Sequence, residues 1–205
     1  EFQGIIPVRG KILNCLKSDY DRIFKNDIIL DLLKVLGCGA EIKNKHKDFS
    51  FFDLDKLNWN KVIICTDADV DGFQIRTLIL TMLYVLTPTL IEKGYVYIAE
   101  SPLYEITDSK DNVYFAYSEA EKNKILKKIK KNYKIQRSKG LGENEPEMMW
   151  KTTMNPETRR LILVTPAEAQ ETKEAFELFL GDNLSGRKEF IAEHGHKYID
   201  ESDVI

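Results

Sequence analysis

Three aspartates at alternate positions are the residues of this sequence best suited to chemistry. Asp67, Asp69 and Asp71 lie in the run Thr66–Gly72, and in extended backbone such residues point to the same side, about 7 Å apart. Carboxylates held so close repel one another unless a cation lies between them. Mg²⁺ prefers such hard oxygen ligands, takes few of them from the protein and keeps several waters. The spacing therefore predicts a Mg²⁺ site at these three residues, which Mn²⁺ could also occupy.

The same acidic run has other interpretations. Aspartate is a good helix N-cap and negative charge suits a helix N-terminus, which would explain one of the three acids. The pattern Asp-x-Asp-x-Asp-Gly also opens a calcium-binding EF-hand loop, but Leu78 stands at the twelfth position, where that loop needs a glutamate. A phosphatase with an aspartyl nucleophile would likewise place Asp-x-Asp after a strand. The local pattern alone leaves the phosphatase open.

The acids lie between a predicted strand and a predicted helix. Lys61–Thr66 is short, apolar and β-branched, as a buried parallel strand is, and Phe73–Ile91 is apolar over helical length. An acidic cluster between such elements lies at the carboxyl edge of an α/β sheet, where ligands bind. A further strand at Tyr95–Ala99 completes a parallel strand–helix–strand unit. We therefore predict an α/β fold, with a mostly parallel sheet flanked by helices and a smaller α+β appendage.

Apolar periodicity and turn residues predict the remaining elements. Ser118 and Glu121 form a capping box ahead of a lysine-rich helix. The lysines of that helix indicate a solvated face, with a weak, salt-sensitive DNA contact as the alternative. The other predictions are strands at Phe2–Val8 and Arg159–Val164, a helix at Asp27–Leu36, a hairpin of Tyr104–Thr107 with Val113–Tyr117, a tight loop at Gln136–Glu143, a short helix at Pro146–Trp150 and a final helix from Thr165 through Leu180.

Composition limits the class of protein. The 205 residues carry a net charge of −3, which excludes a uniformly basic nucleic-acid coat but not local basic clusters. The cysteines, Cys15, Cys38 and Cys65, are far apart and form no Cys-x-x-Cys pair, so no zinc site or disulfide framework is indicated and a reduced, cytoplasmic location is expected. No signal peptide opens the sequence, and Arg76 and Pro88 favour a buried helix over a membrane span.

Four segments, in a fixed order along the chain, carry a resemblance to a known family. They are Pro7–Asn14, Thr66–Leu78, Ile135–Glu143 and Thr152–Arg159. The second resembles the Mg²⁺ motif of the toprim domain of type IIA DNA topoisomerases. Together they resemble the B subunit of bacterial DNA gyrase or its topoisomerase IV counterpart. The resemblance implies a Rossmann-like toprim domain at residues 1–105, truncated at its N-terminal side, and a C-terminal appendage of the gyrase B type at 106–205.

This resemblance implies the Mg²⁺-dependent module that cleaves and religates DNA in a topoisomerase. Mg²⁺ at Asp67 and Asp69, with Asp71 at the rim, would stabilise charge on the reacting phosphate, and a second ion would anchor the backbone nearby. The implied partners are double-stranded DNA and an A subunit whose tyrosine attacks the phosphodiester, in a heterotetramer when full length. ATP would bind only to a domain outside these residues.

Two basic segments are the predicted DNA contacts. Lys11 and Asn14 follow a glycine, so backbone and charge could approach a phosphate together. A solvated turn explains that stretch as well, but the resemblance implies a DNA contact there, with Arg9 as a weaker candidate. In the loop at Gln136–Glu143, Arg137 and Lys139 stand beside two glycines, a combination that can present amides and charge to an anion. These two side chains could lie near the acids or the DNA.

The sequence departs from the family pattern in two places. The family's general acid, a glutamate in a Glu-Gly-Asp-Ser segment, would precede Glu1, so no catalytic residue is assigned within the chain and the chain alone is expected not to cleave DNA. Phe73 and Gln74 also replace the family's usual Ala-His, and glutamine cannot take up a proton as histidine does. The alternatives are another toprim phosphotransferase, or a DNA- and protein-binding module with a structural Mg²⁺. The sequence does not distinguish gyrase from topoisomerase IV.

Overall fold

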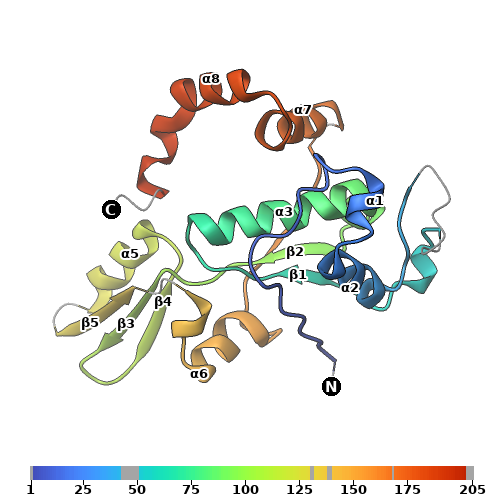
Figure 1. Cartoon of the computed structure of the whole chain (residues 1–205). Coiled ribbons are helices and arrows are strands. Elements are labelled where there is room, and N and C mark those ends of the chain that lie inside the picture. The colour runs from blue at the N-terminus through green and yellow to red at the C-terminus, as the bar shows by residue number, and fades with distance from the viewer. Residues whose placement is uncertain (1, 43–50, 130–131, 138–139, 168, 202–205) are drawn as a thin grey trace. The chain divides into compact units, whose positions relative to one another are not determined.

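The computed structural model describes residues 2–42, 51–129, 132–137, 140–167 and 169–201, and it has an α/β fold (Figure 1). The strands are β1 (Val62–Ile64), β2 (Val96–Ala99), β3 (Tyr104–Asp108), β4 (Val113–Ala116), β5 (Tyr133–Arg137) and β6 (Leu161–Leu163). The helices are α1 (Tyr20–Ile23), α2 (Asp27–Leu36), α3 (Val70–Leu86), α4 (Pro88–Glu92), α5 (Glu119–Ile129), α6 (Pro146–Met149), α7 (Ala169–Leu180) and α8 (Leu184–His194), with the shorter or irregular turns η1 (Leu54–Lys56), η2 (Leu141–Glu143), η3 (Trp150–Met154) and η4 (Gly195–Glu201).

The strands form two three-stranded sheets, in the orders β1-β2-β6 and β4-β3-β5. The α/β prediction is confirmed, since helices alternate with strands and the sheet arrangement is mixed, with parallel strands present. In the described ranges, no helix combines the length and the apolar character needed to cross a bilayer.

Contacts divide the chain into two compact units that interleave along the sequence. The first comprises Glu1–Val62, Gln74–Tyr97 and Leu163–Ile205, and the second comprises Ile63–Phe73 and Ile98–Ile162. The acidic run and both sides of the β3–β4 hairpin therefore belong to the second unit. The predicted sequential division into residues 1–105 and 106–205 stays a prediction.

Helix α2 shows how local sequence determines an element of the first unit. The side chain of Asn26 caps it by accepting the N–H of Ile29, and Gly37 ends it in the left-handed conformation with φ of 81°. Glycine adopts that conformation without steric cost, so the helix stops there. The prediction of a helix at Asp27–Leu36 is confirmed at both ends.

The long apolar helix predicted at Phe73–Ile91 is two helices. The last bond of α3 runs from the N–H of Thr87 to the carbonyl of Leu83 (2.8 Å). Pro88 has no N–H to continue the ladder, and its fixed φ suits the first position of the new helix α4. The predicted length of the helix is therefore wrong. The sequence stays apolar on both sides of Pro88, but the hydrogen-bond ladder of α3 ends before this proline.

The strand predicted at Phe2–Val8 is wrong. This segment has no regular secondary structure within the described residues, and Ile5 is 78% exposed. Gly4 passes so close to the ring of Trp59 that an added Cβ would lie 2.8 Å from the ring atom Cη2. Close packing on an indole, and not strand pairing, holds this stretch of the first unit.

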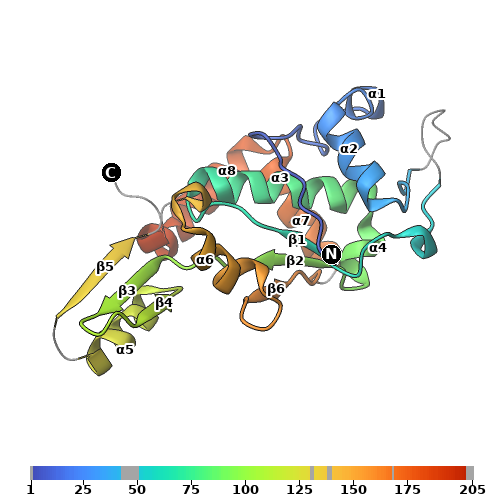
Figure 2. The ribbon, with the colours of Figure 1, turned by 90° about the horizontal axis from the view of Figure 1, so that it is seen from below.

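The second sheet forms the hairpin region of the second unit. Strand β3 pairs antiparallel with β4 and with β5, in the registers Ile106↔Tyr114 and Ile106↔Ile135. Figure 2 shows the three strands side by side with α5 next to them. Tyr104, Ile106 and Ala116 form a small buried core with partly buried residues of α5. The predicted hairpin is confirmed.

Helix α5 begins as its capping box predicts. The Oγ of Ser118 accepts the N–H of Glu121 (3.1 Å), and Oε2 of Glu121 accepts the N–H of Tyr117 (3.0 Å). The loop predicted at Gln136–Glu143 is corrected in its first part, because Gln136 and Arg137 are the last residues of β5. Every residue of β5 is exposed, so the strand has no buried apolar face that would mark it in the sequence.

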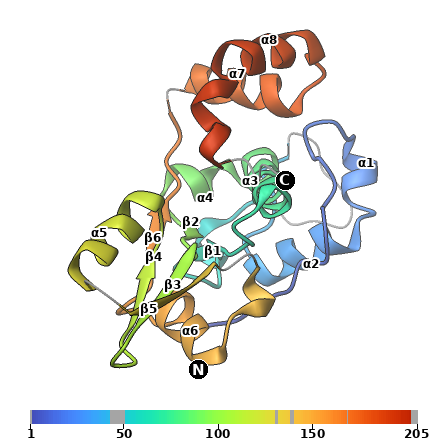
Figure 3. The same ribbon diagram turned by 90° about the vertical axis from the view of Figure 1, so that its left-hand side faces the viewer.

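The C-terminal region contains one more helix than predicted. Helix α7 confirms the predicted helix that runs through Leu180, but it begins at Ala169 and not at Thr165. Its Phe176 stacks on Tyr84 of α3 with ring centroids 4.3 Å apart. Helix α8 follows, next to α7 (Figure 3), and its Phe190 meets Phe179 of α7 edge to face. None of the residues of α8 is buried, so its sequence shows no clear apolar face.

Candidate functional site

The three aspartates lie where β1 passes into α3, but they do not share one strand face. Strand β1 ends at Ile64, and α3 begins at Val70. Asp71 is therefore in the first turn of the helix and exposed, whereas Asp67 and Asp69 are half-buried in the turn before it. The predicted alternation is wrong for Asp71, because successive helical residues rotate about 100° and not 180°.

Asp69 is the N-cap of α3. Its Oδ1 accepts the N–H of Gly72 (2.7 Å), and its carbonyl accepts the N–H of Phe73 (2.9 Å). The side-chain bond satisfies one of the N-terminal amides that have no partner within the helix, and the carbonyl accepts the first bond of the helix ladder. The negative charge also suits the helix N-terminus. The N-cap interpretation of one acid is confirmed.

Gly72 is required for the close approach of the helix to Asp67. It is buried, and an added Cβ would overlap the backbone carbonyl oxygen of Asp67. A larger residue would push the first turn of α3 away from the acids. The glycine after the third aspartate is thus explained by close backbone packing.

A distant segment completes the surroundings of Asp67. The backbone N–H of Leu141 donates to Oδ1 of Asp67 (2.8 Å), across 74 residues of sequence. A Cβ added to Gly140 would lie 3.5 Å from Oδ2 of the same carboxylate. The structure thereby brings together two of the four segments that carry the resemblance. A backbone amide has no sequence signature, so only the glycines beside Leu141 hinted at this approach.

The donors at this turn fit a magnesium ion with few protein ligands. Among the described residues, no group of three or more histidine, cysteine, aspartate or glutamate side chains converges as a metal cage. Asp67 and Asp69 remain as two carboxylates in one short turn, and Mg²⁺ is commonly held by one or two carboxylates together with water and phosphate oxygens. The residues fit such a site and do not fit a three-carboxylate cage.

The thiol beside the acids is unsuited to metal binding. Burial raises the pKa of Cys65, and the negative charge of Asp67 adds to this rise. Mg²⁺ prefers oxygen to sulfur, so this thiol is a poor ligand for the ion that the carboxylates fit. The chemistry of the turn is therefore that of its carboxylates.

The predicted DNA contacts of the first unit lie around a tight turn. Gly10 adopts a φ of 75°, and the flanking Arg9 and Lys11 are exposed. Asn14 has a structural role here: its Nδ2 donates to the carbonyl of Leu180 (3.0 Å), and its Oδ1 accepts the N–H of Leu16 (3.0 Å). Nothing in the sequence indicates that this asparagine links the N-terminal segment to α7.

One of the two predicted contacts of the second unit lies in its sheet. Arg137 is exposed at the end of β5, opposite Tyr104 in the register. Lys139 lies outside the described residues. The next described residues after Arg137, Gly140 and Leu141, lie beside the carboxylate of Asp67.

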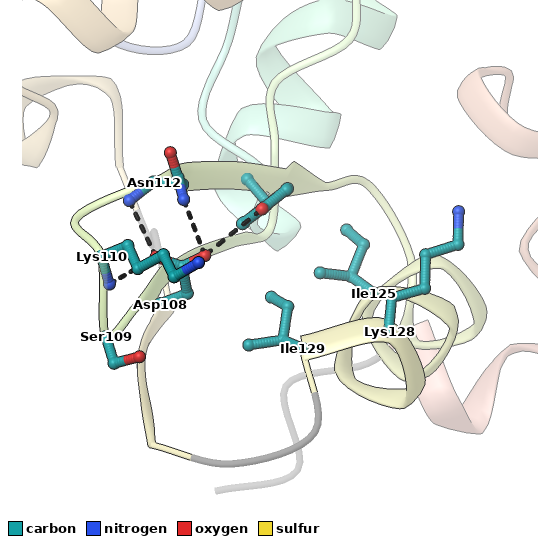
Figure 4. Close-up of a pocket in the computed structure, with 8 residues that line it drawn as sticks. Asp108, Ser109, Lys110, Asn112, Ile125, Lys128 and Ile129 are labelled. Carbon is teal, nitrogen blue, oxygen red and sulfur yellow. Dashed lines mark hydrogen bonds between the residues drawn. The ribbon is translucent and has the colours of Figure 1, made fainter.

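A cavity elsewhere in the second unit is a different kind of feature. It has a volume of about 460 Å³ and lies between the β3–β4 turn and α5 (Figure 4). Its Asp108 accepts the N–H of Lys110 (2.8 Å) and both the N–H and Nδ2 of Asn112 (3.0 and 2.9 Å). These bonds, that of the Asn112 side chain first, lower the pKa of Asp108. Its lining, which contains no predicted site residue, is Asp108, Ser109, Lys110, Asn112, Tyr114, Ile125, Lys128 and Ile129.

Comparison with known proteins gives the same family for both parts of the chain. Residues 1–101 match the Toprim domain model, and residues 130–192 match the model for the carboxyl terminus of the DNA gyrase B subunit. The DNA gyrase B subunit of Thermotoga maritima is 45% identical over 205 residues, which are 100% of this chain and 31% of that protein.

Two further relatives agree. The same gyrase component of Halalkalibacterium halodurans is 43% identical over 99% of this chain and 31% of its own length. That of Thermus thermophilus is 45% identical over 94% and 30%. The chain spans about a third of the length of these relatives.

Proposed function

Because the chain belongs to the type IIA DNA topoisomerase B subunits, with a Toprim domain followed by the gyrase B C-terminal region, we propose that it is the Mg²⁺-dependent DNA cleavage and religation module of such a protein. The observation that carries the proposal is the turn that holds Asp67 and Asp69 together, with Asp67 bonded through Leu141 to another segment that carries the family resemblance. Family membership favours this function over the phosphatase that the local pattern left open.

In the proposed mechanism, Asp67 and Asp69 hold the ion. A bound Mg²⁺ would stabilise negative charge on the reacting phosphate and on the leaving oxygen. Asp69 would bind the ion from the N-cap position of α3, where a hydrogen bond fixes one of its oxygens. Asp67 would bind it in the orientation set by the Leu141 amide. Asp71, exposed on the first helical turn, is assigned to the rim of the site.

The attacking hydroxyl is proposed to come from the tyrosine of an A subunit in a heterotetramer on double-stranded DNA. Two tyrosines of the second unit are unsuited to the attack. Tyr104 is buried and donates to Glu119, and this hydrogen bond raises its pKa. Burial likewise raises the pKa of Tyr117. A raised pKa disfavours the phenolate, so a nucleophile from the partner fits the chemistry better.

The remaining parts of the proposal concern contacts and context. We propose that the DNA backbone is contacted by Arg9, Lys11, Asn14, Arg137 and Lys139. Asn14 would make this contact in addition to its hydrogen bonds with Leu180 and Leu16. ATP would be bound by another part of the full-length protein.

The toprim domain would comprise residues 1–105, and the C-terminal appendage would comprise residues 106–205. The relatives are gyrase subunits, and we therefore favour gyrase over topoisomerase IV, in the cytoplasm, where free thiols such as those of this chain persist.

Mn²⁺ binding tests the metal site directly. The double variant Asp67→Ala/Asp69→Ala should lose the affinity for Mn²⁺, measured by electron paramagnetic resonance. The control is Glu145→Ala/Glu147→Ala, which removes the same charge from exposed carboxylates at α6. Equal binding by wild type and the aspartate double variant would overturn the assignment.

A further inference from the structure

The carboxylate of Asp67 is oriented from outside its own turn. Of its two oxygens, Oδ1 accepts the N–H of Leu141 at 2.8 Å, and Oδ2 lies nearest the position that a Cβ of Gly140 would occupy, at 3.5 Å. Asp69, in contrast, is bonded within its own turn, to Gly72. One of the two proposed ligands is thus held locally and the other by a remote segment.

We propose that the backbone amide of Leu141 is a positioning group for the metal site, which sets the orientation of Asp67 and thereby its affinity for a divalent cation. This inference rests on the proposed function. Metal-ligating carboxylates are usually fixed by a hydrogen bond from a neighbouring group, and loss of such a partner typically lowers metal affinity about 10–100-fold. The donor here is the main chain, so side-chain substitution at position 141 leaves it in place.

The two glycines of this segment differ in what they approach. A Cβ at Gly140 would contact both oxygens and Cγ of Asp67 at 3.5–3.6 Å, whereas a Cβ at Gly142 would meet nothing within 4 Å. Gly140 has an extended backbone, with φ of −138° and ψ of 156°, so its conformation does not require glycine. A Cβ at 140 would thus be in ordinary van der Waals contact with the carboxylate, and a larger side chain there would occupy the space beside it that a metal-bound water or phosphate oxygen would need.

The segment is anchored on both sides, as a positioning group requires. Before it, the edge strand β5 pairs with β3 from Tyr133 to Arg137. After it, the N–H of Asn144 bonds to the carbonyl of Leu141 (3.4 Å), and Met148 of α6 is buried. The Leu141 amide is thus fixed by the fold of the second unit and not by the acidic turn itself.

A proline substitution removes the proposed donor with little change of backbone. Leu141 is the first residue of η2, a position that proline tolerates, and the extended conformation of Gly140 is the one that a residue before proline prefers. Leu141→Ala keeps the amide and shortens the same side chain, so it serves as the baseline. In the whole chain, Leu141→Pro should bind Mn²⁺ about 10–100-fold more weakly than Leu141→Ala.

Two further measurements complete the test. Gly140→Val should weaken Mn²⁺ binding, whereas Gly142→Val should not, and circular dichroism checks that all variants are folded. Without metal, the Leu141 amide of the wild type should be protected from hydrogen exchange, and Asp67→Ala should remove the protection.

The outcomes separate this inference from the proposed function. Equal Mn²⁺ affinity of Leu141→Pro and Leu141→Ala would overturn the positioning role while leaving the metal site intact. If Asp67→Ala/Asp69→Ala binds Mn²⁺ like the wild type, the proposed metal site fails. The positioning role, which rests on that site, then fails with it. Unchanged exchange of the Leu141 amide in Asp67→Ala would also overturn the positioning role.

Discussion

The acidic turn at Asp67–Gly72 and the hairpin turn at Asp108–Asn112 both depend on aspartate oxygens that accept hydrogen bonds from backbone amides. At the hairpin, the donors to Asp108 come from residues two and four positions away. At the acidic turn, Asp69 is bonded locally, but the donor to Asp67 is 74 residues away. Local donors shape a turn, whereas a remote donor links two segments. Asp108 therefore stabilises the turn in which it lies, whereas Asp67 is oriented by a segment distant in the sequence.

The largest effect is expected in the sheet that carries the hairpin turn. Strand β3 ends at Asp108 and pairs with β5, which ends at Arg137, three positions before Gly140 in the sequence. Ile106, fully buried in β3, packs in the core of that sheet. Ile106→Ala should destabilise the sheet by about 2–5 kcal/mol and speed hydrogen exchange at the Leu141 amide as well as in the hairpin.

The matched control for this variant is Val113→Ala in β4, because Val113 is 45% exposed. It should change stability by no more than about 0.5 kcal/mol. If exchange at Leu141 stays the same in Ile106→Ala while the hairpin loosens, the sheet does not support the link to Asp67.

The next effect concerns the close approach at the acidic turn. Gly72→Ala places a Cβ against the carbonyl of Asp67, so it should cost about 1–3 kcal/mol and displace the start of α3. Gly142→Ala, with open space at its Cβ, is the control. Thermal unfolding of both variants measures the difference, and equal melting temperatures would contradict the close packing.

Asp69 allows capping and metal binding to be separated. Asp69→Ala should cost about 1 kcal/mol through loss of the N-cap, whereas asparagine caps as well as aspartate, so Asp69→Asn should keep the helix. Both variants should bind Mn²⁺ weakly, since each lacks the carboxylate. Wild-type affinity in Asp69→Asn would remove Asp69 from the proposed site.

The smallest effect is a pKa at the hairpin. Since the pKa of Asp108 is lowered in the fold, mainly by the Asn112 side chain, its contribution to stability is present above the ordinary aspartate pKa of about 3.9 and is lost as the pH falls through the lowered pKa. Asn112→Ala should move this pKa up toward its ordinary value, and Ser109→Ala should not. Carbon NMR titration of the Asp108 carboxyl group measures its pKa in both variants. The same pKa in Asn112→Ala and wild type would show that the Asn112 side chain does not lower it.

Local chemistry explains what could be predicted from the sequence. The cap and glycine stop of α2, the capping box of α5 and the β3–β4 hairpin each depend on residues a few positions apart. The same holds for the capping role of Asp69. That role is readable because both bonding partners lie within four residues of it.

Contacts between distant segments account for what could not be predicted. The bond from Leu141 to Asp67 involves a main-chain donor, which every residue except proline carries. The prediction that Asp67, Asp69 and Asp71 share one face assumed that extended backbone continues to Asp71. It is wrong because β1 ends at Ile64 and α3 begins at Val70, and the three aspartates themselves do not indicate these boundaries. Phe2–Val8 has a strand-like composition, but a strand also needs a partner, and composition does not supply one.

The bond between Asn14 and Leu180 has a consequence for biosynthesis. It spans 166 residues, and a second bridge, Lys17 to Asp182 at 2.8 Å, joins the same regions. A ribosome adding roughly 5–20 residues per second needs roughly 8–33 s to travel from one partner to the other. Until then, Tyr84 of α3 also lacks Phe176, its stacking partner. The first unit therefore closes only after residue 182 has emerged, and its apolar surface stays open to chaperones for most of the synthesis of this region.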